Sequence, residues 1–396
     1  MKKVLVIGAG FLQRFVIRKA KELGYYTLAV DGNPNAEGFA DADAYAPVNI
    51  VDEKAVCAYA REQGVDGVLT AATDYGVLAA AYTAQELGLP GINYASAQRI
   101  KNKYQVRKCL YEAGADDTPL AYEVSEETNL AQLAETVHYP VMVKPCDGSG
   151  SRGANRVDSA EEFADACRFA MDSSLTRKAT VEPFITGREY GVESFVENGN
   201  VHVLAVMQKW MTQPPYYAEL GHAVPSGLSA EMEEKVRNCV TKAILALGVN
   251  FGSVNMDLLL TEAGGVHIID IGARMGGNLI GSHIIPLATG VDYMANMIRG
   301  AVGDPVDFTP KAHKDAVATR LLAFGDGVVT ELPDFEQMEK TLNVQICHHM
   351  SAGQKVNRYR TNLDGCGYVI AADKTVKAAA DKAEAVRKNI EAYIIG

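Results

Sequence analysis

The first hundred residues alternate strand-like and helix-like segments, and this alternation constrains the fold more than any other feature. Short apolar runs bounded by turn residues predict strands at Val4–Ile7, Thr27–Val30 and Gly67–Thr70. Between and after them, amphipathic segments predict helices at Leu12–Leu23, Glu53–Gln63 and Gly76–Leu87. Strands that alternate with helices usually pair in parallel, so we expect an α/β domain with helices on the faces of its sheet.

A basic segment, Ala97–Ala113, predicts one helix at the end of this part. Beyond about Pro119 the pattern changes to antiparallel strands, and apolar segments on either side of glycine-containing turns predict two hairpins. Their strands are Glu189–Val196 with Val201–Lys209, and Val254–Leu260 with Val266–Ile271. The last ninety residues predict an α+β unit with a strand at Ala316–Phe324 and a closing helix at Thr375–Ile390.

At 396 residues the chain is too long for one compact core, so two or three domains are expected. The net charge of −11 disfavours nucleic acids and anionic membranes as partners. No apolar run reaches the roughly 20 residues that a membrane span needs. The seven cysteines are scattered and form no CxxC pair, which is typical of reduced thiols in the cytoplasm. Cys347-His348-His349 does not predict a metal site, because adjacent strand residues alternate faces.

The run from Gly8 to Gln13 follows the first predicted strand, and Asp31 follows the second. Its two glycines, Gly8 and Gly10, resemble part of a dinucleotide fingerprint at the start of a helix. Gln13 stands where that fingerprint has its third glycine. Two interpretations stay open: a tight turn in a Rossmann-like domain, or the nicotinamide site of an NAD-dependent oxidoreductase.

A second glycine-rich run, Asp147–Gly153, follows a predicted strand at 139–145 that contains Lys144. Backbone N–H groups in such loops cradle phosphates, and the lysine adds a fixed positive charge. The run is not a Walker A loop, because its lysine precedes the glycines. It predicts either a phosphate-binding loop or a mobile hairpin.

About thirty residues later, Glu182-Pro183-Phe184 precedes Glu189, which begins a predicted strand. Pro183 lacks an N–H and has a fixed φ angle, so we expect a linker here and not a strand in the middle of a sheet. Exposed backbone groups of a linker are able to bind the edge of an adenine, and Glu189 is able to accept ribose hydroxyls. The alternative is a pair of solvated glutamates, because glutamate is mostly exposed.

Two aspartates lie on the second predicted hairpin. A turn centred on Ala263-Gly264 places Asp257 directly opposite Asp270, so both side chains point to the same face. Like charges in that position are destabilising, and carboxylate oxygens suit Mg²⁺, so we expect a metal ion between them. Arg274 follows at the end of the strand as a donor for an anion. The alternative is a slipped register that separates the aspartates.

In order and spacing, these residues resemble the ATP-grasp superfamily. The resemblance rests on Lys103, Lys144, Glu182 with Glu189, Asp257 with Asp270, and Arg274. It covers essentially the whole chain and implies a Rossmann-like pre-ATP-grasp domain at 1–97, a two-lobed ATP-grasp domain at 98–310 with a mobile lid at about 118–182, and a small C-terminal α+β domain at 311–396.

The resemblance also implies a role for each of these residues. Lys103 and Lys144 would bind phosphates under the glycine-rich loop, which includes Gly148, Gly150 and Ser151. The segment from Glu182 to Phe184 would bind adenine, Glu189 would bind ribose, and Asp257 with Asp270 would bind Mg²⁺ or Mn²⁺. Many relatives have asparagine two residues after the second acid, where this chain has Gly272, so the number of metal ions stays open.

Within the superfamily, Glu219-Leu220-Gly221-His222 and the run that starts at Arg274 are similar to amino-acid ligases that make dipeptides. The similarity implies that Glu219 and His222 contact the amino substrate and that Arg274 holds a carboxylate or an acyl phosphate. An ammonium needs an acidic partner and an oxyanion needs positive donors, so the residue types fit. Asn278 would set the size of the pocket. The alternative for Glu219 and His222 is a solvated loop.

The resemblance therefore implies an ATP-dependent carboxylate–amine ligase that forms an amide or peptide bond through an acyl phosphate, with catalytic roles for Lys144 and Arg274. ATP and Mg²⁺ are the expected cofactors, and small carboxylates and amines are the expected substrates. A homodimer is left open. Three alternatives remain: a carboxylase or purine-type ligase of the same superfamily, an NAD-dependent oxidoreductase, and a non-catalytic nucleotide sensor.

Overall fold

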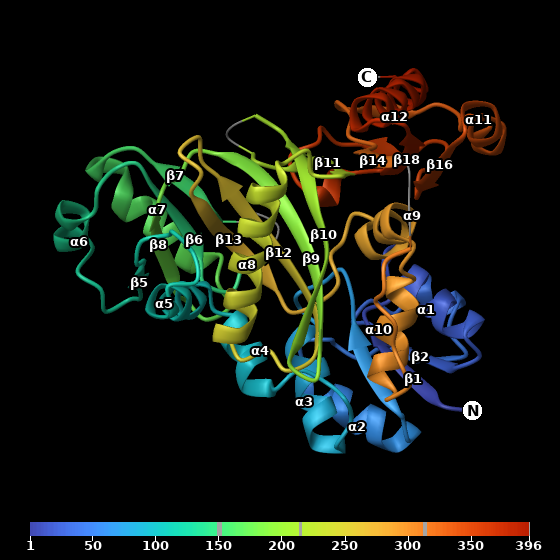
Figure 1. Cartoon of the computed structure of the whole chain (residues 1–396), viewed down its shortest axis with the longest axis horizontal. Coiled ribbons are helices and arrows are strands. Elements are labelled where there is room, and N and C mark those ends of the chain that lie inside the picture. Colours follow the sequence, from blue (N-terminus) through green and yellow to red (C-terminus); the bar gives the residue numbers. More distant parts are fainter. Residues whose placement is uncertain (149–152, 214–215, 312–314, 396) are drawn as a thin grey trace.

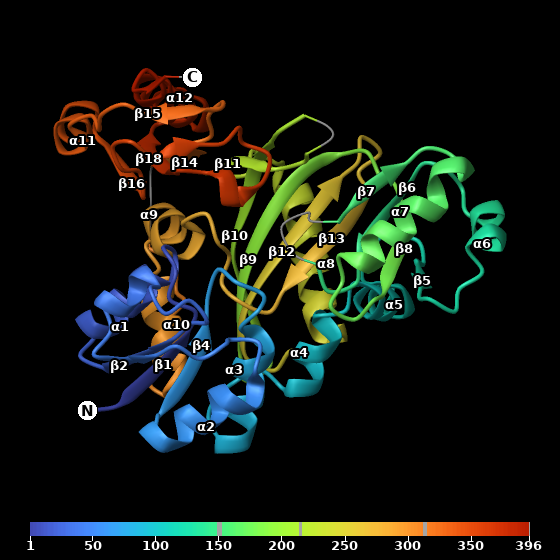
Figure 2. The ribbon, with the colours of Figure 1, turned by 180° about the vertical axis from the view of Figure 1, so that it is seen from behind.

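The computed structural model describes residues 1–148, 153–213, 216–311 and 315–395. Figure 1 shows a blue N-terminal domain, a central part in green and yellow, and a red C-terminal domain. Both Figure 1 and the view from behind in Figure 2 place the long strands β9 (Arg188–Glu197) and β10 (Asn200–Met211) in the middle of the molecule. Within the described ranges, no helix is both long enough and apolar enough to cross a membrane.

The N-terminal domain is built on a four-stranded parallel sheet, as the alternation predicts. In the order β3-β2-β1-β4, its strands are Ala44–Ala46, Tyr26–Val30, Lys3–Ile7 and Gly67–Thr70. Its covering helices are α2 (Glu53–Gln63) and α3 (Val77–Leu87) on one face, and α1 (Gln13–Glu22) and α10 (Tyr293–Ala301) on the other. Tyr293 of α10 belongs to the same core as Val4 of β1. A distant segment of the chain therefore completes this domain.

The basic segment forms two helices, so the prediction of one helix over Ala97–Ala113 is wrong. The helices are α4 (Tyr94–Ile100) and α5 (Lys103–Ala113). Asn102 has extended backbone angles, and its side chain accepts a hydrogen bond from the backbone N–H of Gln105. An asparagine that caps a helix in this way starts a new helix. The junction brings Lys101 and Lys103 to the lining of a pocket.

A separate four-stranded antiparallel sheet lies at the far side of the central part. In the order β5-β8-β6-β7, its strands are Tyr122–Val124, Ala179–Pro183, Val141–Pro145 and Asn155–Val157. The helices α6 (Leu130–Thr136) and α7 (Ala160–Asp172) pack on it. The prediction of a linker at Glu182–Phe184 is wrong for Glu182 and Pro183, because β8 is an inner strand. Pro183 is tolerated because it ends the strand and pairs on one side only, with Val141.

An eight-stranded sheet connects the central part with the C-terminal domain. In the order β13-β12-β9-β10-β11-β14-β18-β16, the strands not yet given are Val266–Gly272, Gly252–Leu260, Glu219–Val224, Ala316–Leu321, Gly367–Asp373 and Val344–His348. Both predicted hairpins, β9–β10 and β12–β13, are present. The helices α5 and α8 (Ala230–Ala246) cover one face of the sheet with apolar contacts. Side chains alternate along each strand, so the other face carries the polar residues described below.

The remaining elements are short segments and the rest of the C-terminal domain. They are η1 (Glu37–Ala40), η2 (Ile280–Ile284), α9 (Ile285–Thr289), β15 (Gly327–Val329), α11 (Phe335–Leu342), β17 (Lys355–Val356), η3 (Asn362–Asp364), α12 (Val376–Glu391) and β19 (Ile394–Ile395). β14 pairs with β11, and α10 packs on the N-terminal sheet, so contacts cross both predicted domain boundaries. The division at residues 97 and 310 stays a prediction.

Candidate active site

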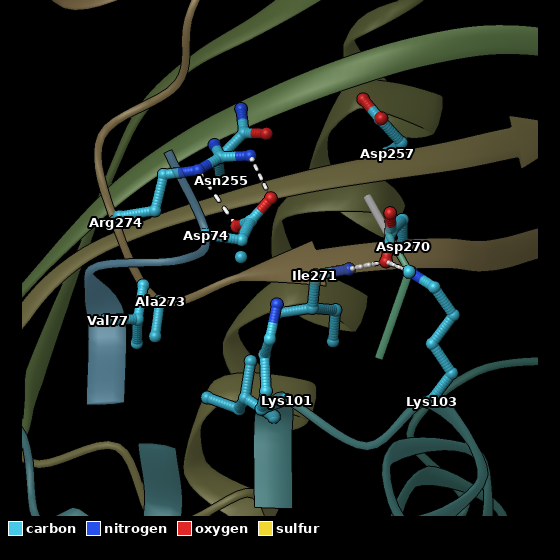
Figure 3. Close-up of a pocket in the computed structure, with 13 residues that line it drawn as sticks. Asp74, Val77, Lys101, Lys103, Asn255, Asp257, Asp270, Ile271, Ala273 and Arg274 are labelled. Carbon is cyan, nitrogen blue, oxygen red and sulfur yellow. Dashed lines mark hydrogen bonds and ion pairs between the residues drawn. The ribbon is translucent and has the colours of Figure 1, made fainter. Parts of the chain in front are cut away.

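The site is a pocket at the meeting point of the N-terminal domain, the α4–α5 junction and the β12–β13 hairpin. Figure 3 shows its charged side chains. The pocket is lined by Asp74, Val77, Ile100, Lys101, Lys103, Gly148, Asn255, Asp257, Asp270, Ile271, Gly272, Ala273 and Arg274. Five residues predicted from the sequence therefore line one cavity: Lys103, Gly148, Asp257, Asp270 and Arg274. Gly150 and Ser151, predicted for the phosphate loop, lie outside the described residues.

Asp257 and Asp270 face each other across the β12–β13 ladder, so the predicted register is confirmed at this pair. Nearer the turn, however, Leu258 pairs with Ile268, and Ile269 is an extra residue between the two registers. This bulge, and not the turn alone, sets the pairing of the two acids. Bulges often occur next to active sites, where they redirect side chains.

The two carboxylates fit a metal ion that completes its shell with other ligands. Within the described ranges no cluster of three or more histidine, cysteine or acidic side chains is arranged to hold a metal. Mg²⁺ usually takes one or two carboxylates and fills its other positions with water and phosphate oxygens. Asp257 and Asp270 supply two such carboxylates. Asn255, which also lines the pocket, pairs with Gly272 across the same ladder.

Lys209 is a buried cation that sequence reasoning missed. Its side chain is 1% exposed, and its Nζ lies 3.0 Å from Glu189 Oε1, 2.7 Å from Glu219 Oε1 and 2.8 Å from Asp257 Oδ1. Burial opposes the charge, but the three carboxylates raise the pKa of the ammonium above its usual value. Burial raises the pKa of Asp257 to about 7, with Lys209 acting in the opposite direction. The residues predicted for ribose, metal and amine thus share one ammonium.

Two further lysines predicted for phosphates are held by acids. Lys103 forms an ion pair with Asp270, and Lys144 Nζ lies 3.0 Å from Glu182 Oε2. Burial lowers the pKa of Lys103, but Asp270 more than offsets this and raises it overall. A second, smaller cavity is lined by Lys103, Glu182 and Asp270. Glu182 is therefore paired with Lys144, and Glu189 is paired with Lys209. These ion pairs exclude the alternative of two solvated glutamates.

Phe184 differs from its expected role. Its backbone N–H donates to the carbonyl oxygen of Pro140 at 3.1 Å, so this donor is already used. The guanidinium carbon of Arg156 lies 4.5 Å from the centroid of the Phe184 ring. Phe184 therefore presents an aromatic face and no exposed backbone N–H.

Asp74 is a second residue that sequence reasoning missed. It follows β4 and pairs with Arg274, with Nε 3.0 Å from Oδ1 and Nη2 3.2 Å from Oδ2. Burial opposes the negative charge of Asp74, but Arg274 lowers the pKa of the carboxyl below its usual value. The neighbouring backbone adds a parallel bridge between Ala71 and Met275. The available signal was its place after a parallel strand, where ligand sites form in α/β sheets.

The loop after Arg274 is held from inside by Glu193. This fully buried carboxylate accepts hydrogen bonds from Tyr293 Oη at 2.7 Å, Asn255 Nδ2 at 3.0 Å and the backbone N–H of Gly276 at 3.2 Å. Burial raises the pKa of Glu193 to about 7. Glu193 thereby links the core of the N-terminal domain to the loop that presents Arg274.

The three residues predicted for the amino substrate come together. Glu219 and His222 belong to β11, which excludes the solvated-loop alternative. Asn278 Nδ2 donates to Glu219 Oε2, and His222 Nε2 lies 3.7 Å from Glu219 Oε1. Burial opposes the charge of Glu219, but Lys209 and His222 lower its pKa to about 2. Burial lowers the pKa of His222 to about 4, so the imidazole is neutral at pH 7.

The C-terminal domain adds residues to this cluster that no sequence signal pointed to. Asn362 Nδ2 donates to Glu219 Oε2 at 2.9 Å, and Tyr359 Oη donates to the backbone oxygen of Glu219. Tyr368 Oη donates to Asn278 Oδ1 at 2.9 Å. The cluster around Glu219 therefore contains side chains from the C-terminal domain as well as from the central part.

In the first glycine-rich turn, two backbone N–H groups already donate hydrogen bonds to side chains of the N-terminal domain. The backbone N–H of Ala9 donates to Asp31 Oδ2 at 2.8 Å, and that of Gly10 donates to Gln13 Oε1 at 3.0 Å. Gln13 Nε2 donates in turn to the carbonyl of Ala71 at 2.6 Å. Gln13 thus occupies the loop where a dinucleotide phosphate would bind, which favours the tight-turn interpretation.

The central part of this fold contains an ATP-grasp domain. Residues 137–282 match the ATP-grasp domain. More particularly, residues 320–394 match L-amino acid ligase C-terminal domain 2. The chain therefore carries an ATP-grasp domain followed by the C-terminal domain found in L-amino acid ligases.

Individual relatives cover the chain to different extents. The L-amino acid ligase of Bacillus licheniformis has the same fold, with a TM-score of 0.82 at 24% identity, over 100% of this chain and 98% of that chain. Human carnosine synthase 1 is 24% identical over 76% of this chain, which spans only 40% of that longer protein. The formate-dependent phosphoribosylglycinamide formyltransferase of Sulfurisphaera tokodaii is 24% identical over 96% of this chain and 95% of its own length.

Proposed function

We propose that this chain is an ATP-dependent carboxylate–amine ligase that makes an amide or peptide bond through an acyl phosphate. The observation that carries the proposal is Lys209, which joins Glu189, Asp257 and Glu219 on one face of the sheet. By resemblance these residues serve ribose, metal and amine. A nucleotide and an amine bound there would lie on the same strands. The two domain matches and the L-amino acid ligase with the same fold support this class.

In the proposed reaction, an oxygen of the carboxylate substrate attacks the γ-phosphorus of ATP, and ADP leaves. The amine binds as an ammonium and first loses one proton to water. Its nitrogen then attacks the carbonyl carbon and loses a second proton, and phosphate departs with the electrons of the C–O bond. Phosphoryl transfer of this kind depends mostly on positioning and charge stabilisation. Arg274 would stabilise the charge on the acyl phosphate and then on the tetrahedral oxyanion.

Lys103 and Lys144 would hold the phosphates of ATP, and Glu189 its ribose. Asp257 and Asp270 would hold Mg²⁺ or Mn²⁺, which when bound neutralises phosphate charge. Glu219 would bind the ammonium form of the amine, because its low pKa keeps the carboxyl ionised. We infer that residues 118–182 act as a lid, which excludes water from an acyl phosphate that would otherwise hydrolyse.

We also infer a cytoplasmic protein, because all seven cysteines are free thiols. A homodimer stays a prediction, which light scattering of the purified protein tests directly.

The test is a screen for phosphate release with ATP, Mg²⁺ and pairs of amino acids or small carboxylic acids, followed by mass spectrometry of the products. We expect an amide or dipeptide together with one ADP and one phosphate per bond. Arg274→Ala should abolish that coupled product. ADP formed only with bicarbonate, and no C–N product from any amine, would place the chain with the carboxylases instead.

A second candidate is a formate-dependent formyl transfer to phosphoribosylglycinamide. It is favoured by the relative that matches almost end to end, the formyltransferase of Sulfurisphaera tokodaii. Formate is also a carboxylate that is activated by ATP, so the same screen with formate and phosphoribosylglycinamide separates the two candidates. A formylated product would select this second function.

A further inference from the structure

Among the described residues that line the pocket in Figure 3, one cation forms no ion pair with a carboxylate. Lys103 pairs with Asp270, and Arg274 pairs with Asp74. The third acid of the pocket, Asp257, pairs with Lys209, which reaches it from β10. Lys101 also lines the pocket, but among the described residues no carboxylate lies within ion-pair distance of its ammonium.

The surroundings of Lys101 make an unpaired ammonium unfavourable. Its Nζ lies 5.1 Å from the centroid of the Tyr75 ring. Burial lowers the pKa of Lys101, the negative charge of Asp74 opposes this, and the positive charge of Lys103 adds to it. Removing a charge from water is costly unless a counter-charge is present. An anion in the pocket would supply that counter-charge.

Arg274 has part of its guanidinium available for the same anion. Its Nε and Nη2 make a side-on contact with the two oxygens of Asp74. Nη1 has only a 3.5 Å contact with the carbonyl oxygen of Met275. Because a guanidinium presents donors on more than one edge, Arg274 is able to bind a second carboxylate while Asp74 holds it in place.

We propose that Lys101 and the Nη1 edge of Arg274 bind the carboxylate group of the acyl substrate. The assignment rests on the proposed ligase function and adds a location for one of its substrates. Val77, Ile100 and Ala273 line the same pocket with apolar surface, so the substrate is a carboxylic acid with a compact aliphatic part beside its acid group. Asp74 acts as a positioning residue, because it fixes Arg274 from the N-terminal domain.

The γ-phosphate of ATP is an anion of similar chemistry and is the competing occupant. Two observations favour the carboxylate. Lys103, the lysine assigned to phosphates, is at the Asp270 side of the pocket, whereas Figure 3 draws Lys101 between that pair and the Asp74–Arg274 pair. Arg274, which completes the proposed carboxylate site, lies outside the predicted nucleotide set, as does its partner Asp74.

The test compares Lys101→Met with Lys103→Met in the full-length protein. Methionine keeps the aliphatic length and removes the charge. Lys108→Met is the matched control, because Lys108 is on α5 with a side chain that is 48% exposed. Thermal unfolding of each variant shows whether it is folded. The KM values for ATP and for the carboxylate identified by the screen are then measured, and binding of AMP-PNP is measured by calorimetry.

For Lys101→Met we expect the carboxylate KM to rise about 10- to 100-fold, as is typical for loss of a charged hydrogen bond, with the ATP KM and AMP-PNP affinity unchanged. Lys103→Met should instead weaken AMP-PNP, and Lys108→Met should change neither. A weaker AMP-PNP affinity in Lys101→Met, or an unchanged carboxylate KM, overturns the assignment. Absence of any product from the wild-type protein defeats the ligase proposal itself, and the AMP-PNP measurement still decides whether Lys101 is a nucleotide residue.

Discussion

Asn362 Nδ2 donates a hydrogen bond to Glu219 Oε2 at 2.9 Å, although the two residues belong to different predicted domains. The same oxygen accepts from Asn278, and Glu219 Oε1 contacts Lys209. The acid proposed for the amine is thus oriented by donors on three sides. Side chains that are fixed in this way lose little freedom when a ligand binds, which favours affinity.

The first prediction concerns Asn362. Asn362→Ala removes one donor to Glu219 and should raise the KM for the amine about 5- to 10-fold, the usual effect of about 1 kcal/mol. The ATP KM should not change, because the side chain of Asn362 contacts Glu219 and Tyr359 and, among the described residues, hydrogen-bonds to no residue of the nucleotide set. Steady-state kinetics with the amine varied provide the measurement. Asn35→Ala, on an exposed loop of the N-terminal domain, is the control; an equal effect in both variants would contradict the role of Asn362.

The second prediction concerns stability. Lys209→Met leaves three partly buried carboxylates without their shared buried ammonium, and breaking a buried ion pair in this way typically costs about 3–5 kcal/mol. Urea unfolding at pH 7.5 measures the loss. Lys242→Met, on the exposed side of α8, should stay within about 0.5 kcal/mol of the wild type. Lowering the pH should partly restore Lys209→Met, because the acids then become neutral; a loss that does not depend on pH would contradict this explanation.

Whether a contact in the site could be predicted from the sequence depends on how close its two residues are along the chain. Asp257 and Asp270 are thirteen positions apart on one hairpin, so turn position and strand period were enough to predict that they face each other. Even there, the extra residue at Ile269 was not foreseen. Lys209, Asp74 and Asn362 reach the site only through the order of strands in the sheet and the packing of domains. No single segment of sequence contains that information.

The two wrong element predictions have local causes. Asn102 carried a cap signal within the basic segment, but the helical pattern on both sides hid it. Pro183 disfavours an inner strand, yet proline is compatible with a position where only one neighbouring strand pairs. In both cases the structure depends on the hydrogen bonds of the neighbouring residues and not only on the type of the single residue.

The third prediction is a pH dependence that originates at Glu193. Burial raises the pKa of this carboxyl from 4.5 to about 7, so between these pH values the folded state holds a proton that the unfolded state has lost. This contribution to stability is complete below pH 4.5 and disappears as the pH rises through 7, by up to roughly 3 kcal/mol at about 1.4 kcal/mol per pKa unit. Urea unfolding of wild type and Glu193→Gln from pH 4.5 to 7.5 isolates it. A stability difference between the two that stays constant over this range would show that folding does not raise the pKa of Glu193.

The last prediction tests the metal. Asp257 and Asp270 lie directly opposite each other, and each is balanced by a lysine, Lys209 and Lys103 respectively. A divalent cation with phosphate oxygens in its shell would replace part of that balance, so we expect turnover to need Mg²⁺ or Mn²⁺. Asp270→Asn keeps the size of the side chain and removes the charge, and should lower phosphate release by at least about 10²-fold while leaving the unfolding midpoint within a few degrees.

Phosphate release is measured with added Mg²⁺, with Mn²⁺ and after EDTA treatment. Asp66→Asn, an exposed change before β4, controls for the chemistry of the substitution and should retain activity. Full turnover in EDTA, or wild-type rates in Asp270→Asn, would remove the metal from this pair of acids and leave their contact with Lys103 and Lys209 as their role.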